Sequence, residues 1–111
     1  MSSEIISTSR ITVQPEKSYE LCLTISSLLG RIRQEPGCRN YWFYGDEKDA
    51  NSFILIGEWV TQEAWDKHLK SENFAILLGS LKLLSKKSNV EFQVLSHSAP
   101  IEEVTRTRCI A

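Results

Sequence analysis

Two neighbouring strand-like segments, at residues 38–45 and 53–60, are apolar or aromatic on both faces, and they constrain the fold more than any other feature. A sheet with one face in water alternates apolar and polar residues along its strands. The chain has 111 residues, the size of one domain. A domain of this size with two dry sheet faces needs a cover on the second face. We therefore expect a partner subunit, a ligand or both on that face.

The spacing of apolar residues predicts the other elements. A stripe of Leu21, Ile25, Leu28 and Ile32 has the spacings of an amphipathic helix. We expect this helix to begin at Pro15 and Glu16, to carry Arg31 and Arg33 in its last turn, and to be stopped by Pro36-Gly37. The hydroxyls of Thr61 and Ser71 are suited to cap two further helices, the second with a stripe of Phe74, Leu77, Leu78, Leu81 and Leu84. Further strands are predicted at residues 5–13 and 90–95.

The predicted order is strand, helix, strand, strand, helix pair, strand. This order is typical of the ferredoxin-like split β-α-β plan, an α+β fold with helices on one face of a four-stranded antiparallel sheet. We expect the folded domain to span residues 1–98 and residues 99–111 to form a C-terminal tail.

Composition argues against several classes of function. Lys and Arg number 13 and Asp and Glu 14, so the net charge of −1 gives no basic field for nucleic acid. The apolar run Phe53–Ile56 is too short to cross a membrane, and no signal peptide is visible, so we expect a cytoplasmic protein. Three widely spaced cysteines and two histidines suggest neither a disulfide framework nor a metal site, and we expect no cofactor.

A recognisable pattern runs through most of the chain: Pro36-Gly37-Cys38, Tyr41, Glu58-Trp59, Ala64, His68, Leu69 and Phe74. In this pattern, between about residues 5 and 97, the chain resembles the antibiotic biosynthesis monooxygenase (ABM) domain family. The resemblance implies a homodimer in which two sheets pair to form a dimeric α+β barrel, and this would cover the second dry face. Family members include cofactor-free quinone-forming oxygenases and haem-degrading enzymes.

The resemblance and the aromatic strands together favour a cofactor-independent monooxygenase that acts on a small aromatic of the phenol, hydroquinone or anthrone type. Such a substrate reduces oxygen itself once it is deprotonated in a dry aromatic pocket. His68 is the candidate general base, because its unperturbed pKa is near ~6.5. The candidate pocket-lining residues are Trp59, Trp42, Tyr44, Trp65 and Phe74.

Other readings of the same residues stay open. Trp42 and Tyr44 share one strand face, and the sequence does not say whether this face or the other lines the pocket. Packing alone would also explain His68 and Trp59. The fold could equally serve as a non-catalytic small-ligand-binding or sensing module.

Haem binding or degradation is a third and disfavoured function. Members of the haem-degrading branch carry an Asn, a Trp and a His at three positions of the fold. The aligned positions of this chain hold Ser9, His68 and Leu78. A leucine has no donor atom for iron.

Overall fold

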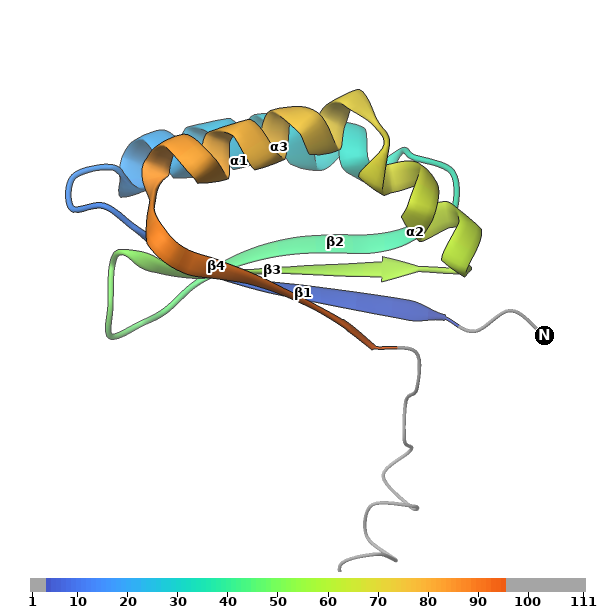
Figure 1. The fold of residues 1–111 in the computed structure, drawn as a ribbon, viewed down its shortest axis with the longest axis horizontal. Coiled ribbons are helices and arrows are strands. Elements are labelled where there is room, and N and C mark those ends of the chain that lie inside the picture. The colour runs from blue at the N-terminus through green and yellow to red at the C-terminus, as the bar shows by residue number, and fades with distance from the viewer. Residues whose placement is uncertain (1–3, 96–111) are drawn as a thin grey trace, which may run out of the picture.

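The computed structural model describes residues 4–95, and for residues 86–92 the description covers the backbone alone. The four strands form one antiparallel sheet in the order β2-β3-β1-β4. All three helices lie on one side of this sheet (Figure 1). This is the expected ferredoxin-like α+β fold. The elements in chain order are β1 Ile5–Val13, α1 Ser18–Arg33, β2 Cys38–Gly45, β3 Ser52–Trp59, α2 Gln62–Leu69, α3 Glu72–Leu84 and β4 Ser85–Leu95.

The predicted helix stripes and helix caps are confirmed. The four residues expected on the buried stripe of α1 are buried, and so are four of the five expected on α3. The fifth, Leu78, is partly exposed but packs against the core. Thr61 accepts a hydrogen bond from the Ala64 backbone N–H, and Ser71 accepts one from that of Phe74. Each hydroxyl therefore satisfies a backbone donor in the first turn of its helix.

The start of α1 was predicted wrongly. Pro15 and Glu16 form a turn, closed by a 3.0 Å hydrogen bond from the Lys17 N–H to the Gln14 carbonyl, and the helix begins at Ser18. Glu16 has a φ of 72°, in the left-handed region that the third residue of a type II turn requires. Proline is favoured at the second position of this turn, which Pro15 occupies, so Pro15 belongs to the turn and not to the helix.

The start of β4 was also predicted too late, at Val90. The strand begins at Ser85, directly after α3, because the far end of β1 needs a backbone partner and Val13 pairs with Ser85. The expected tail at residues 99–111 lies outside the described residues. Within residues 4–95, no helix has both the length and the apolar character to cross a membrane.

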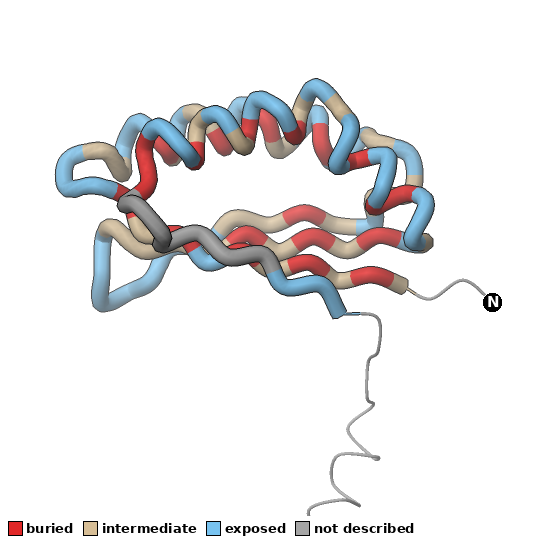
Figure 2. The backbone as a smooth tube through the Cα atoms, viewed as in Figure 1, coloured by how far each residue is buried: buried red, intermediate tan, exposed pale blue. Residues whose placement is uncertain are grey.

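The sheet has two distinct faces, and buried positions alternate along β1 and β3 (Figure 2). The inner face packs against the helices and carries Ile5, Ser7, Ser9, Ile11, Val13, Tyr41, Phe43, Leu55, Gly57 and Trp59. The outer face, on the opposite side, carries Ile6, Thr8, Arg10, Thr12, Trp42, Tyr44, Ile54, Ile56 and Glu58.

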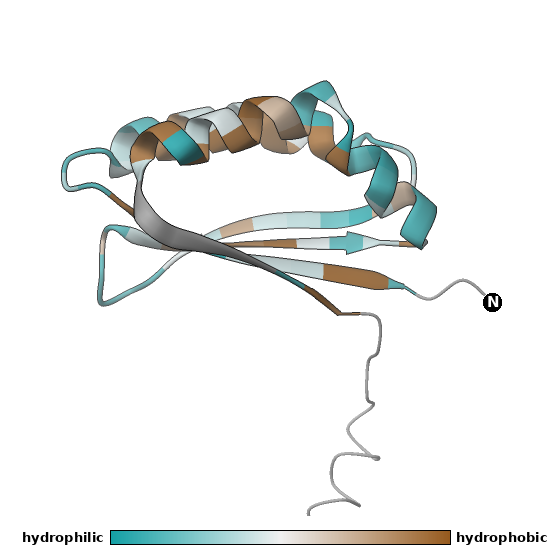
Figure 3. Ribbon diagram, in the orientation of Figure 1, coloured by the Kyte–Doolittle hydropathy of each residue, from teal (hydrophilic) through white to brown (hydrophobic). Residues whose placement is uncertain are grey.

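The helix layer is not uniform in character. Most of α3 is hydrophobic, whereas α2 is largely hydrophilic (Figure 3). The buried residues of α2 are Ala64, Trp65 and His68, so indole and imidazole rings replace aliphatic side chains at this end of the core. The interior beneath α2 is therefore the place where polar chemistry is available.

Candidate functional site

The turn between α1 and β2 positions the acidic group of the site. Gly37 has a φ of 81°, a conformation that L side chains rarely adopt, and a Cβ at this position would collide with the Cβ of Ala64 on α2. The Gly37 carbonyl also accepts a 2.9 Å hydrogen bond from the Val60 N–H. The turn therefore lies directly against the start of α2, which brings Glu35 next to that helix.

His68 occupies the inner side of α2, inside a set of aromatic rings. Its ring is fully buried and stacks on Trp59 with a centroid distance of 4.4 Å and an interplanar angle of 27°. Phe74 packs edge-on at 5.0 Å, and Tyr41 and Trp65 each lie at 5.7 Å. Aromatic contacts thus surround the imidazole and fix its orientation.

Glu35 holds one nitrogen of this imidazole. Its Oε1 lies 2.9 Å from His68 Nδ1, and its Oε2 accepts a 2.9 Å hydrogen bond from Asn73 Nδ2. A carboxylate only accepts hydrogen bonds, so Nδ1 of His68 carries the proton. In the neutral imidazole, Nε2 is then an unprotonated acceptor, and it has no hydrogen-bond partner within the described part of the chain.

Electrostatics keep this imidazole neutral, and they keep the Tyr41 phenol and the Cys38 thiol protonated. Burial lowers the pKa of His68 below its ordinary 6.5, and the hydrogen bond and charge of Glu35 oppose that shift only in part. Burial also raises the pKa of the Tyr41 hydroxyl. The pKa of the Cys38 thiol is raised to about 11 by burial and by the charge of Glu35. Cys38 is therefore a thiol and no nucleophile at neutral pH.

A second group of polar atoms lies on the inner face of the sheet beside Trp59. Tyr41, Gly57 and Ser7 form one row across β2, β3 and β1. A Cβ placed on Gly57 would lie 2.9 Å from Nε1 of Trp59, 3.0 Å from Oγ of Ser7 and 3.0 Å from the ring of Tyr41. The Trp59 ring thus leans over this row.

Two polar side-chain atoms on the inner face, one on Trp59 and one on Ser9, are buried and have no hydrogen-bond partner among the residues that the structure describes. They are the Trp59 Nε1 and the Ser9 Oγ. Nε1 of Trp59 and Nε2 of His68 therefore give the interior beneath α2 unused hydrogen-bonding capacity, while Ser9 lies farther along β1, opposite Leu55.

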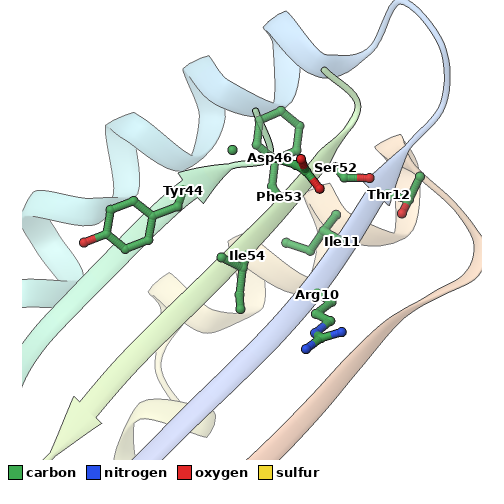
Figure 4. A pocket seen from close by; sticks show the side chains of 9 residues that line it. Arg10, Ile11, Thr12, Tyr44, Asp46, Ser52, Phe53 and Ile54 are labelled. Atoms are coloured by element: carbon green, nitrogen blue, oxygen red, sulfur yellow. The ribbon is translucent and has the colours of Figure 1, made fainter. Parts of the chain in front are cut away.

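The predicted site residues separate into two groups. Trp59, Trp65 and Phe74 lie with His68 between the sheet and the helices. Trp42 and Tyr44 lie on the outer face, and Tyr44 borders a depression of about 390 Å³ there, together with Arg10 of β1 and Ile54 of β3 (Figure 4). The two groups do not form one pocket within a single chain, and the role of each stays a prediction.

Sequence reasoning missed Glu35, Asn73 and Ser7 as members of the site. Ser7 and Ser9 do carry a signal, since they alternate with Ile5 and Ile11 and so occupy core positions of the first strand. The pairing of Glu35 with a histidine 33 positions away has no such local signal.

Two polar contacts involve residues of β2. Glu58 accepts a 2.6 Å hydrogen bond from Asn40 Nδ2, and Arg39 pairs with Glu4 at 3.0 Å. Within the described ranges, no three side chains of His, Cys, Asp or Glu are grouped so that they could hold a metal ion.

Comparison with known proteins agrees with this fold. The family model of the antibiotic biosynthesis monooxygenase domain matches residues 5–75, and the chain belongs to this family. It is 30% identical over 95 residues to the uncharacterized protein sll1783 of Synechocystis, across 85% of this chain. The chain spans only 65% of the length of that relative.

Solved structures share the architecture. PA3566 of Pseudomonas aeruginosa is 26% identical, with a TM-score of 0.78 over 89% of this chain and 98% of its own. SnoaB of Streptomyces nogalater, a cofactor-independent oxygenase, has a TM-score of 0.78 at 19% identity, covering 92% of this chain and 100% of its own. At that identity the similarity to SnoaB concerns the fold alone.

Proposed function

We propose that the protein is a cofactor-independent oxygenase of a small, electron-rich hydroxyaromatic compound, with His68 as the general base. The observation that carries the proposal is the unpaired Nε2 of His68, enclosed by aromatic rings and opposite a nitrogen that Glu35 holds. The membership of the ABM family supports the reaction class.

The first step is a proton transfer. Nε2 of the neutral His68 takes the proton of the substrate hydroxyl, which leaves a phenolate-type anion and an imidazolium. The Glu35 carboxylate, 2.9 Å from Nδ1, stabilises the imidazolium charge that develops. Burial alone would make His68 a weak base, so this carboxylate is what allows it to accept the proton.

In the second step the anion transfers one electron to O₂, and the resulting radical and superoxide combine at a ring carbon to give a peroxide anion. The imidazolium of His68 returns its proton to this anion, which gives the hydroperoxide and restores the neutral base. Loss of water from the peroxide converts a CH₂ carbon of an anthrone-type ring to a carbonyl. Substrate plus O₂ thus gives quinone plus H₂O, with the substrate carbon oxidised and oxygen reduced.

Oxygen consumption tests the proposal. Purified protein is incubated with anthrone and with 1,4-dihydroxynaphthalene, and O₂ uptake and quinone formation are followed together. We expect uptake above the uncatalysed background, and at least a hundredfold loss in His68→Gln, since a general base typically contributes that much. If O₂ uptake with both compounds stays at the uncatalysed rate, the oxygenase function is refuted for this substrate class.

We also propose a homodimer through the outer face of the sheet. Trp42, Ile54 and Ile56 are half-buried on this face, and the side chain of Tyr44 is 50% exposed, an unusual apolar content for a face left in water. A second copy would bury on the order of 2,000 Å² in total.

Sedimentation of an outer-face variant tests the dimer. We expect a dimer at low micromolar concentration, and a monomer after Ile56→Lys, because the new charge would be buried in the interface. Ala75→Lys, on the exposed side of α3, is the matched control and should stay dimeric. A monomeric wild-type protein would refute the proposal.

Non-catalytic ligand binding is the second candidate. The unpaired Nε2 of His68 and Nε1 of Trp59 support it, because a ligand could satisfy both atoms without reacting. Under this function a ligand raises the melting temperature and is recovered unchanged. Turnover of that ligand would rule the candidate out.

A further inference from the structure

Trp59 presents a hydrogen-bond donor that the fold leaves unused. Its ring is fully buried, and its Nε1 has no partner among the residues that the structure describes. An indole N–H can only donate, and a buried donor without an acceptor destabilises the folded state. Burial of an indole in a core is ordinary, but its N–H usually finds a partner. This one is therefore a candidate contact for a ligand.

The surroundings hold this N–H in place. Nε1 of Trp59 and Oγ of Ser7 both lie within 3.0 Å of the point where a Cβ of residue 57 would be, and only glycine leaves that point empty. Tyr41 meets Trp59 edge-on with centroids 6.3 Å apart, and Trp65 packs against its ring at 6.2 Å. The direction of the N–H is thus set by packing on several sides.

The unused donor has a complementary acceptor on the stacked ring. His68 lies 4.4 Å from Trp59 between ring centroids, and its Nε2 is unprotonated because Nδ1 donates to Glu35. A phenolic hydroxyl both accepts and donates one hydrogen bond, so its chemistry matches one N–H donor and one bare nitrogen. An unsubstituted hydrocarbon matches neither group.

We infer that the indole N–H of Trp59 binds the oxygen of a hydroxyaromatic ligand whose proton goes to Nε2 of His68. This assignment rests on the proposed function and deepens it, since it names the group that recognises the substrate oxygen. After proton transfer the oxygen carries negative charge, and the hydrogen bond from Trp59 becomes charge-assisted and stronger. Trp59 thereby acts as a catalytic residue and selects aromatics that bear a ring oxygen.

Indole NMR signals of the intact protein test the contact directly. The chain has three tryptophans, and Trp42→Phe and Trp65→Phe each remove one N–H resonance, which assigns the third to Trp59. The probe is 1,4-naphthoquinone, whose carbonyl oxygens accept hydrogen bonds, and naphthalene is the control without oxygen. We expect the quinone to move the Trp59 N–H resonance downfield and to slow its solvent exchange. Naphthalene should cause no such downfield shift.

A variant that keeps the ring provides a second measurement. Gly57→Ala displaces Nε1, because the added Cβ would lie 2.9 Å from it, and should weaken binding of 1,4-naphthoquinone by about tenfold. Gly79→Ala on α3, where nothing lies within 4 Å of the added Cβ, should bind as the wild type does. Urea unfolding checks that both variants are folded before binding is measured.

The outcomes separate this inference from the oxygenase function. A quinone-induced shift at Trp59 without any oxygen uptake supports the contact and refutes the oxygenase. Oxygen uptake with equal kcat/KM in wild type and Trp59→Phe, and with an unmoved Trp59 resonance, supports the oxygenase and overturns the contact. A naphthalene-induced downfield shift equal to that of the quinone, or no quinone binding at all, also overturns the contact.

Discussion

Replacing Glu35 by glutamine isolates the charge that supports His68. Glutamine has nearly the same shape, so its amide oxygen can still accept from His68 Nδ1, while its amide nitrogen can donate to Asn73 once the Asn73 amide rotates to present Oδ1. Two charge-assisted hydrogen bonds of 2.9 Å become neutral ones. A hydrogen bond to a charged group contributes about 1.5–3 kcal/mol and a neutral one about 0.5–1.5 kcal/mol. The Glu35 side chain is only 14% exposed, so solvent screens the loss weakly.

Three effects follow from this change. The free energy of unfolding should fall by about 2–3 kcal/mol, roughly half of it from each bond. The pKa of His68 should fall further, because the anion that stabilises the imidazolium is gone. If His68 is the base, the weaker bond to Nδ1, a loss of about 1–1.5 kcal/mol, slows proton abstraction by about tenfold.

The assay follows the imidazole itself. The chain has two histidines, so a His97→Gln background leaves His68 as the only ring to titrate by NMR. Glu58→Gln is the matched control, since Glu58 also accepts a hydrogen bond from an asparagine but lies on the outer face without a histidine. A titration curve of His68 that is unchanged by Glu35→Gln would refute the coupling, whatever happens to stability.

Three smaller changes test other parts of the site. Burial lowers the pKa of His68, so as pH falls the unfolded chain binds a proton at this residue before the folded chain does. The free energy of unfolding should therefore fall as pH drops below about 6.5. Urea unfolding should show this pH dependence in the wild type and not in His68→Gln. Gly37→Ala should lower the free energy of unfolding in urea by about 2 kcal/mol or more, because of the φ of 81° and the collision with Ala64. Gly79→Ala, in the middle of a helix, should raise it by about 0.5–1 kcal/mol, and equal effects of the two variants would refute the turn argument. Ser9→Ala should leave stability unchanged or raise it by up to about 1 kcal/mol, because its hydroxyl has no partner among the described residues; a large loss by thermal unfolding would show that the hydroxyl is satisfied.

The sequence predicted the elements well because apolar spacing is a local property. The stripe of α1, the caps Thr61 and Ser71, and the two strands of the hairpin all depend on neighbours within a few residues. The error at Glu16 has the same origin, since a proline followed by an acid is equally suited to a turn and to a helix start. The chain must reverse its direction between β1 and α1, and this requirement makes Pro15 and Glu16 a turn.

The site was predictable only in part. Alternation along a strand showed that Trp42 and Tyr44 share a face, but it could not say which face the helices cover. That depends on how α2 docks on the sheet, which the fit between Gly37 and Ala64 helps to set. The contact of Glu35 with His68 exists only after this docking, so it is a property of the folded chain.

The inner face is costly to build in the form that the structure shows. Three buried atoms, on Ser9, Trp59 and His68, have no partner within the described residues, and each such atom costs about 1–3 kcal/mol. The net stability of a domain of this size is only about 5–15 kcal/mol, so the cost of three such atoms is comparable with it. Aliphatic side chains of similar volume would avoid that cost, as they do under α1 and α3. The unpaired atoms of Trp59 and His68 lie where α2 meets the turn at Glu35, on and beside the ring that the Glu35 carboxylate orients. Stability alone does not account for that arrangement, whereas a ligand that satisfies a donor and an acceptor does.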